Sequence, residues 1–232
     1  MSRQLLLPIR LHDIATFENF FPGLNVELIS QLTDLSSNKN QSGHMIYLYG
    51  DTGCGKTHLL HAVCRCADRS GLTVGYIPLC DANMSLEILE DIALNDLICL
   101  DDVQAVAGKE QWERGILDLY EQSRARGGNM IVAGRQSLEK MSLSLADLKS
   151  RLASELTYGV ISLTDNEKSA ALQLRAQSRG FDLSEEVISY VLKRYPRDTH
   201  SLFGLLDQID NLSLVEGRRI TIPLIRELEL NG

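Results

Sequence analysis

The sequence predicts an α/β protein in which a doubly wound, parallel five-stranded sheet is followed by a small α-helical domain. Three observations support this prediction. Up to about residue 163, short apolar or β-branched runs alternate with helical patterns. Beyond that point the strands stop and four helical patterns follow one another. A glycine-rich loop, GDTGCGKT at 50–57, joins the first predicted strand to a helix.

The predicted strands lie at 45–50, 73–79, 97–102, 130–134 and 158–163. Four of them are nearly apolar throughout, as expected for parallel strands that are covered by helices on both faces. Helices are predicted between them at 57–68, 86–93, 111–126 and 145–154. The polar stretch from Ser36 to Ser42 is predicted to be a loop before the first strand.

The helical part begins at Thr164, because Thr164 and Glu167 have the spacing of a capping box. This first helix should run to about Arg179. Ser184 should cap a second helix that stops before Pro196, and Pro223 lies in the first turn of the last helix. The third helix is predicted at 199–216. We therefore divide the chain into a tail at 1–12, a sheet domain at 13–163 and a helical domain at 164–232.

Composition indicates an ordinary globular protein of 232 residues, 44% hydrophobic and 23% charged. The net charge of −8 disfavours tight binding of bare DNA. No run approaches the roughly 18 apolar residues that would span a bilayer, and no secretion signal is recognisable. The five cysteines are odd in number, and Cys64 and Cys66 diverge on a predicted helix. We expect free thiols and a cytoplasmic location.

The strongest chemical signal is the stretch that fits G-x-x-x-x-G-K-[ST] after a strand and at the start of a helix. Its backbone N–H groups and the helix N-terminus should bind phosphates. Lys56 is expected to reach the β- and γ-phosphates, and Thr57 to bind Mg²⁺ through its hydroxyl. The predicted nucleotide-binding residues are Gly50, Asp51, Thr52, Gly53, Cys54, Gly55, Lys56, Thr57 and the following His58.

A pair of carboxylates supports this site. The apolar run from Leu97 ends in Asp101 and Asp102. Asp101 is placed to join the Mg²⁺ shell, and Asp102 to orient a water molecule. The expected cofactors are ADP or ATP with Mg²⁺.

These residues resemble a known family. The phosphate loop followed by HLLHA (58–62), the stretch LICLDDVQAVAGKE (97–110) and the segment TFENFFPG (16–23) resemble the AAA+ module of the bacterial replication initiator DnaA. The helical part resembles its lid. Three stretches of that lid, at 172–187, 201–210 and 218–230, are more similar to the Hda group of regulatory DnaA homologues. The initiator carries a DNA-binding domain after its lid, and we expect this protein to lack that domain.

The resemblance also implies a partner for the tail. Gln4, Leu5, Leu7, Pro8 and Ile9 resemble the peptide by which replication proteins dock on the DNA polymerase sliding clamp. An extended peptide of this kind inserts alternate side chains into pockets. The alternative is that this apolar stretch packs as an edge strand on the body of the chain.

Two departures from the family pattern indicate slow hydrolysis by the chain itself. The tip of the fourth strand reads Ala133-Gly134-Arg135, where the family usually has a polar side chain that can polarise water. In the lid, the position of an expected arginine is occupied by His200, which is mostly neutral at pH 7. Arg197 lies about one turn away, and the sequence leaves open which of the two faces the nucleotide.

Arg151 occupies the position where the family has an arginine finger that reaches a neighbour's nucleotide. The alternative is a solvated arginine, for which Glu155 is a possible partner. The function implied by the resemblance is regulation of replication initiation through hydrolysis of DnaA-bound ATP, which prevents re-initiation. The implied partners are the sliding clamp and DnaA, with DNA reached only through the clamp and self-association left open. The competing hypotheses are a self-contained ATPase of the helicase-loader type and an origin-binding initiator fragment.

Overall fold

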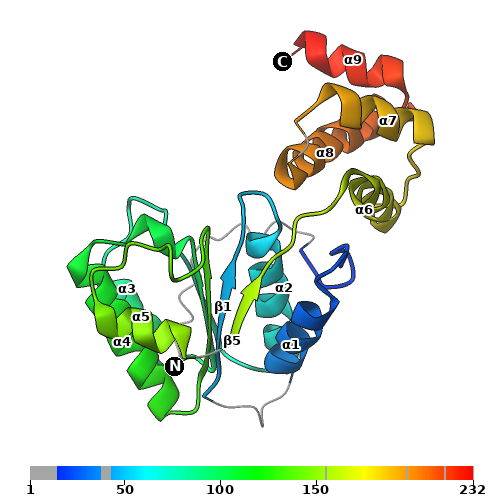
Figure 1. The fold of residues 1–232 in the computed structure, drawn as a ribbon. Coiled ribbons are helices and arrows are strands. Elements are labelled where there is room, and N and C mark those ends of the chain that lie inside the picture. The colour runs from blue at the N-terminus through cyan, green and yellow to red at the C-terminus, as the bar shows by residue number, and fades with distance from the viewer. Residues whose placement is uncertain (1–14, 38–42, 155, 197, 217, 232) are drawn as a thin grey trace.

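The computed structural model describes residues 15–37, 43–154, 156–196, 198–216 and 218–231. They form a sheet with helices on both faces and a separate group of four helices (Figure 1). The strands are β1 (Met45–Tyr49), β2 (Val74–Pro78), β3 (Leu97–Asp101), β4 (Asn129–Gly134) and β5 (Leu156–Gly159). The helices are α1 (Val26–Ser37), α2 (Lys56–Arg69), α3 (Glu87–Ile92), α4 (Glu110–Ala125), α5 (Ala146–Ala153), α6 (Asp165–Ser178), α7 (Glu185–Arg194), α8 (Thr199–Glu216) and α9 (Ile222–Asn231), with a short 3₁₀ turn at Val103–Ala105.

The sheet has the order β2-β3-β4-β1-β5, and every recorded pair is parallel. The predicted five-stranded, doubly wound parallel sheet is therefore confirmed. β1 lies inside the sheet between β4 and β5. The loop that follows β1 therefore lies at the carboxyl edge of the sheet, beside the carboxyl ends of β4 and β5. In open parallel sheets this edge is where ligands bind.

Alternation along the strands divides the core into two layers. Met45 and Tyr47 of β1 pack with residues of α3, α4 and α5, whereas Ile46 and Leu48 pack with residues of α1 and α2. Figure 1 shows these two groups of helices on opposite faces of the sheet. β3 is buried along its whole length, which explains why LICL reads as a continuous apolar run.

The last strand differs from its prediction at 158–163, because β5 spans Leu156–Gly159. Val160 N–H still donates to the Tyr49 carbonyl at 2.7 Å, but the next residue leaves the sheet. The buried side chain of Asn25 binds both backbone groups of Ile161, donating to its carbonyl at 2.9 Å and accepting from its N–H at 2.8 Å. These bonds replace a continued β ladder.

The predicted loop at 36–42 is also partly wrong, because Ser36 and Ser37 form the last turn of α1, an element for which no prediction was made. Ser36 is buried, and its hydroxyl donates to the Leu32 carbonyl one turn earlier at 2.8 Å. A serine at a helix end can satisfy its polar group within the helix, so polarity did not indicate a loop here. Residues 38–42 lie outside the described part of the chain.

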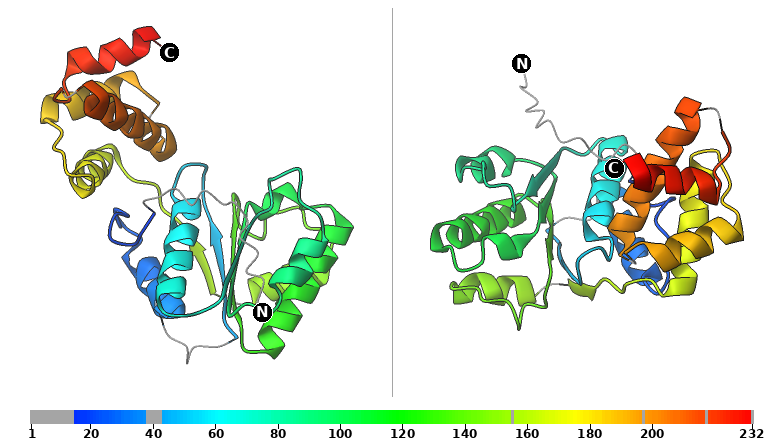
Figure 2. Two further views of the ribbon diagram at one scale, coloured as in Figure 1. Left: turned by 180° about the vertical axis from the view of Figure 1, so that it is seen from behind. Right: turned by 90° about the horizontal axis from the view of Figure 1, so that it is seen from above.

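The four C-terminal helices have a core of their own, built by Leu172, Val187, Leu202, Leu206 and Ile225 among others. The capping box at the start of α6 is present, since Thr164 Oγ1 accepts from Glu167 N–H while Glu167 accepts from Thr164 N–H. Ser184 caps α7 as predicted. Figure 2 shows this group beyond the sheet and its covering helices, joined to them by the segment after β5.

Within the described residues, no helix is long and apolar enough to cross a membrane. The five cysteines are all free thiols, as predicted. No cluster of three or more His, Cys, Asp or Glu side chains suited to a metal ion occurs in the described part of the chain.

Candidate functional site

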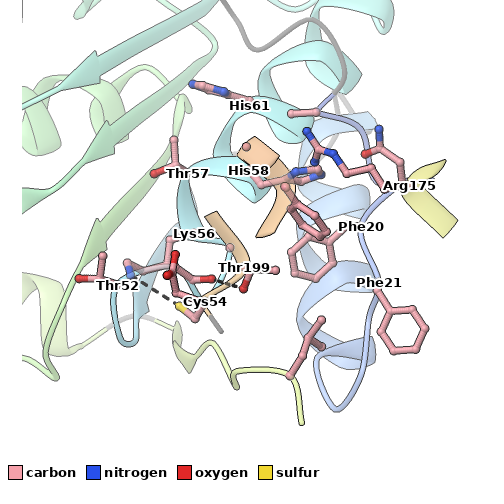
Figure 3. A pocket seen from close by; sticks show the side chains of 18 of the residues that line it. Phe20, Phe21, Thr52, Cys54, Lys56, Thr57, His58, His61, Arg175 and Thr199 are labelled. Carbon is pink, nitrogen blue, oxygen red and sulfur yellow. Dashed lines mark hydrogen bonds between the residues drawn. The ribbon is translucent and has the colours of Figure 1, made fainter. Parts of the chain in front are cut away.

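A cavity of about 390 Å³ lies where three segments meet at the carboxyl edge of the sheet (Figure 3). The phosphate loop and the start of α2 form one wall. The segment before α1, with Phe20 and Phe21, forms a second wall, and helices α6 and α8 form the third. The residues of the predicted site that line it are Thr52, Gly53, Cys54, Gly55, Lys56, Thr57, His58 and Asp102.

Two glycines of the loop have conformations that other residues rarely adopt. Gly53 has φ of 80° and Gly55 has φ of 105°. A Cβ atom on Gly55 would lie 2.7 Å from the ring of Phe20, and one on Gly53 would lie 3.3 Å from Asp198 of the lid segment. The loop is therefore closely approached from both sides, and α2 begins directly after it with its N–H groups at the cavity.

Lys56 is buried and folds back over the loop that precedes it. Its ammonium group donates to the carbonyls of Gly50 at 2.7 Å and Asp51 at 2.9 Å, and lies 3.6 Å from the Cys54 thiol. These partners are neutral, so the positive charge of Lys56 is not compensated by a carboxylate in these contacts. An arriving phosphate would provide the stronger, charge-assisted partner.

Asp101 and Thr57 lie together at the end of β3 and the start of α2. Thr57 Oγ1 donates to Asp101 Oδ2 at 2.6 Å, and the Tyr76 hydroxyl donates to the same oxygen at 3.1 Å. Burial raises the pKa of Asp101, and the hydrogen bonds from Thr57 and Tyr76 oppose this shift. A hydroxyl and a carboxylate in contact beside a phosphate loop are the oxygen ligands that suit Mg²⁺, so the residues present fit this ion. Tyr76 was not predicted, because nothing in the β2 sequence distinguishes it from a core tyrosine.

Asp102 has the one positive φ found among described residues other than glycine, at 56°. Its carboxylate accepts from Gln104 Nε2 at 2.6 Å, and Gln104 Oε1 accepts from the backbone N–H of Arg135 at 3.1 Å. Gln104 therefore links the ends of β3 and β4, a role that the sequence did not indicate. Arg135 also lines the cavity, whereas Ala133 and Gly134 before it are buried and carry no polar side chain.

The lid contacts the loop directly through α8. The Thr199 hydroxyl donates to the Gly53 carbonyl, and Phe203, one turn further along α8, also lines the cavity. His200 lies in the first turn of α8, but its side chain and all of Arg197 are outside what the structure describes. The described lid cation that lines the cavity is Arg175 of α6. Its position three residues after buried Leu172, on the apolar face of the helix, is the signal that could have identified it.

Arg151 is not among the residues that line this cavity. It lies on α5, and its Nε is 3.0 Å from the Glu121 carboxylate on α4. Both side chains are about half exposed, at 53% and 49%. Glu155, the possible partner of Arg151 in the alternative interpretation, lies outside the described residues, as do Gln4, Leu5, Leu7, Pro8 and Ile9 of the tail.

The comparisons with known proteins identify both parts of the chain. Residues 11–163 match the family model of the bacterial DnaA ATPase domain, and residues 165–228 match that of the Hda lid domain. Domain III of the Thermotoga maritima replication initiation protein DnaA is 20% identical with a TM-score of 0.77, covering 91% of this chain and 93% of that one.

Two longer DnaA structures are also similar. Replication initiator DnaA bound to AMPPCP and single-stranded DNA is 24% identical with a TM-score of 0.73, covering 84% of this chain and 64% of that one. AMPPCP-bound DnaA from Aquifex aeolicus is 24% identical with a TM-score of 0.72, covering 86% and 65%. This chain thus spans less than two thirds of these initiators, and at such identities the likeness shows the fold. The family matches show more: this chain belongs to the family of the bacterial DnaA ATPase domain, as an AAA+ protein with a lid of the Hda type.

Proposed function

We propose that this protein regulates replication initiation by binding a nucleotide, docking on the DNA polymerase sliding clamp and supplying Arg151 to DnaA-bound ATP. The family matches support a DnaA-related protein, and the Hda-type lid favours the regulatory group over the initiator. The observation that carries the proposal is the position of Arg151, which is exposed and lies outside the chain's own nucleotide cavity.

Nucleotide binding is supported by the geometry of the phosphate loop. The N–H groups at the start of α2 and the ammonium of Lys56 would hold the phosphates of ADP or ATP. Thr57 and Asp101 would hold Mg²⁺, which neutralises phosphate charge when bound. Two of the DnaA structures that resemble this chain contain the nucleotide analogue AMPPCP.

The ion pair between Arg151 and Glu121 is compatible with an arginine finger, because Arg151 must leave Glu121 to reach the nucleotide of DnaA. Both partners are about half exposed, and such surface pairs contribute only about 0–1 kcal/mol. A guanidinium in this state can exchange a carboxylate for the oxygens of a phosphate, which it binds with the same planar geometry. Because the gain is largest as charge develops on the phosphate, Arg151 would raise the rate of hydrolysis more than the affinity.

The test measures conversion of DnaA-bound ATP to ADP in the presence of this protein and DNA-loaded clamp. Arg151→Ala should lose nearly all stimulation, since arginine fingers delivered in trans contribute about 10³–10⁵-fold. Arg151→Lys should recover little, because an ammonium lacks the planar fork. Lys149→Ala, which removes another cation from α5, should keep full stimulation. If Arg151→Ala stimulates DnaA as well as the parent does, the finger mechanism is wrong, and exposed Arg126 and Arg135 become the candidates.

A second arm of the same experiment tests the tail. Changing Gln4, Leu7 and Ile9 together to Ala should abolish clamp binding and the clamp-dependent stimulation. Thermal stability should stay unchanged if the tail is a docking peptide. A large loss of stability would instead support the alternative in which this stretch packs on the body of the chain.

One observation favours the competing function of a self-contained ATPase. Asp102 lines the cavity and is held by Gln104, so a carboxylate is available to orient water beside the chain's own nucleotide. This function predicts brisk ATP turnover by the purified protein without DnaA or clamp. The regulatory proposal predicts weak turnover under those conditions, because Ala133 and Gly134 at the end of β4 offer no polar side chain.

A further inference from the structure

Arg175 is a buried cation without an adequate partner. Its residue surface is 6% exposed, yet it lines the cavity from helix α6. Its guanidinium lies 4.5 Å over the ring of Phe203, and its closest carboxylate oxygen, Asp207 Oδ1, is 3.8 Å away. That separation is too long for a hydrogen bond. Within the described part of the chain, Nε of Arg175 is buried with no acceptor.

The nearby carboxylates lie closer to a different arginine. Arg179, one turn along α6, lies 2.6 Å from Asp207 Oδ1 and 3.5 Å from Asp210 Oδ2. It therefore takes the closer contact with Asp207. Burial lowers the pKa of Arg175; the negative charge of Asp207 opposes this shift and repulsion from Arg179 adds to it, and the guanidinium remains protonated at any working pH. A charged donor of this kind is costly to bury unless something supplies acceptors.

The position of Arg175 relative to the phosphate loop indicates what that acceptor is. Thr199 at the start of α8 touches the loop at Gly53, whereas Phe203 and Asp207 follow one and two turns later, about 6 and 12 Å along the helix axis. Arg175 packs at the level of Phe203 and Asp207. In Figure 3 it lies on the side of the cavity where Phe20 and His58 project, and Lys56 lies on the other side.

The phosphate loop and Phe20, His58 and Arg175 line the same cavity, so a nucleotide whose phosphates occupy the loop would place its ribose and base toward these residues. The rings of Phe20 and His58, with centroids 5.4 Å apart, provide aromatic surface there. We propose that Arg175 donates hydrogen bonds to acceptor atoms on the base of the bound nucleotide, with Phe203 holding the guanidinium in place. This inference rests on the proposed nucleotide binding and adds the group that recognises the end of the ligand remote from the phosphates.

The test separates the nucleoside end of the ligand from the phosphates by titrating two ligands into the full-length protein. ADP carries a ribose and a base, whereas inorganic pyrophosphate carries only the phosphate groups. In calorimetric titrations, Arg175→Met should weaken ADP binding by about 10- to 100-fold and leave pyrophosphate binding unchanged. Arg175→Lys should restore only part of the loss, because a single ammonium lacks the planar fork. Thermal unfolding without ligand should show Arg175→Met to be as stable as the parent or more stable.

Arg179→Met is the matched control, since Arg179 lies on the same helix, is similarly buried and is absent from the cavity lining. It should cost stability without a selective loss of ADP over pyrophosphate. Equal weakening of both ligands by Arg175→Met would place Arg175 at the phosphates and overturn the inference, as would unchanged affinity for both. If the parent protein bound neither ligand, the proposed nucleotide binding itself would fail and this inference with it.

Discussion

Glu113 is a fully buried carboxylate that holds the start of the helix bearing Arg151. It lies on α4 with 0% exposed surface. Its Oε1 accepts from the backbone N–H groups of Gly108 at 2.6 Å and Ser144 at 3.0 Å, and its Oε2 accepts from that of Leu145 at 2.6 Å. Leu145 is the residue that precedes α5. We predict that Glu113→Gln, a change of one oxygen to an amide nitrogen, strongly destabilises the protein.

The magnitude follows from these three contacts. An amide keeps one acceptor oxygen, so two bonds survive but lose their charge assistance, at about 1 kcal/mol each. The third N–H, on Leu145, then faces an NH₂ group and remains unpaired, which costs about 1–3 kcal/mol. The free energy of unfolding should therefore fall by about 3–5 kcal/mol. With a urea m-value of about 2 kcal/mol/M, the midpoint should fall by about 1.5–2.5 M.

Urea unfolding followed by circular dichroism provides the measurement, and Glu110→Gln provides the control. Glu110 lies one turn earlier on the same helix and pairs with Arg114 at 3.1 Å, with side chains 71% and 64% exposed. Removing this surface pair should cost about 0–1 kcal/mol. If Glu113→Gln shifts the midpoint no more than Glu110→Gln does, the three backbone contacts do not stabilise the fold as argued.

Two further predictions concern the nucleotide site. Lys56→Met keeps the length of the side chain but removes its charge, so calorimetry should show ADP affinity reduced by about 10- to 100-fold; an unchanged dissociation constant would mean that the loop does not bind phosphates. Asp101→Asn tests the cost of the buried charge. Burial raises the pKa of Asp101, so the folded protein holds the proton of this carboxyl more tightly than the unfolded chain does. The contribution of Asp101 to the free energy of unfolding therefore declines as pH rises from the unfolded pKa of about 3.9 to the raised pKa of the folded state. The stability of Asp101→Asn relative to the parent should therefore increase with pH over that window in urea titrations, and a constant difference would contradict the argument.

Much of the fold followed from local sequence patterns. The strands of a covered parallel sheet need apolar residues on both faces, so runs such as LICL before Asp101 predict buried strands at nearly their observed bounds. Helix caps also depend on residues that are close together in the sequence, and Thr164 and Ser184 cap α6 and α7 as predicted. The motif at 50–57 predicted a loop between a strand and a helix, because its glycines and its position are both encoded within a few residues, and residues 52–57 of this loop line the cavity.

Contacts between residues far apart in the chain were decided by the tertiary structure. Asn25 ends β5 by binding Ile161, 136 positions away, so no pattern around residue 160 could place that end. Glu113 reads as one more charged residue of an amphipathic helix, and only the fold brings the N–H groups of Ser144 and Leu145, 31 and 32 positions away, to its carboxylate.

The same distinction applies to the lid and to Arg151. Arg175 was not predicted from the sequence, because its distance from a carboxylate depends on how α6 packs on α8 and on Arg179 making the closer contact with Asp207. Arg151 was identified by family resemblance, yet its exposure and its pairing with Glu121 arise from the packing of α5 on α4. Local patterns determine which segments are helix, strand or phosphate loop, because the responsible forces act within a few residues. The partner of each buried charge depends on which segments meet, and that is a property of the folded chain.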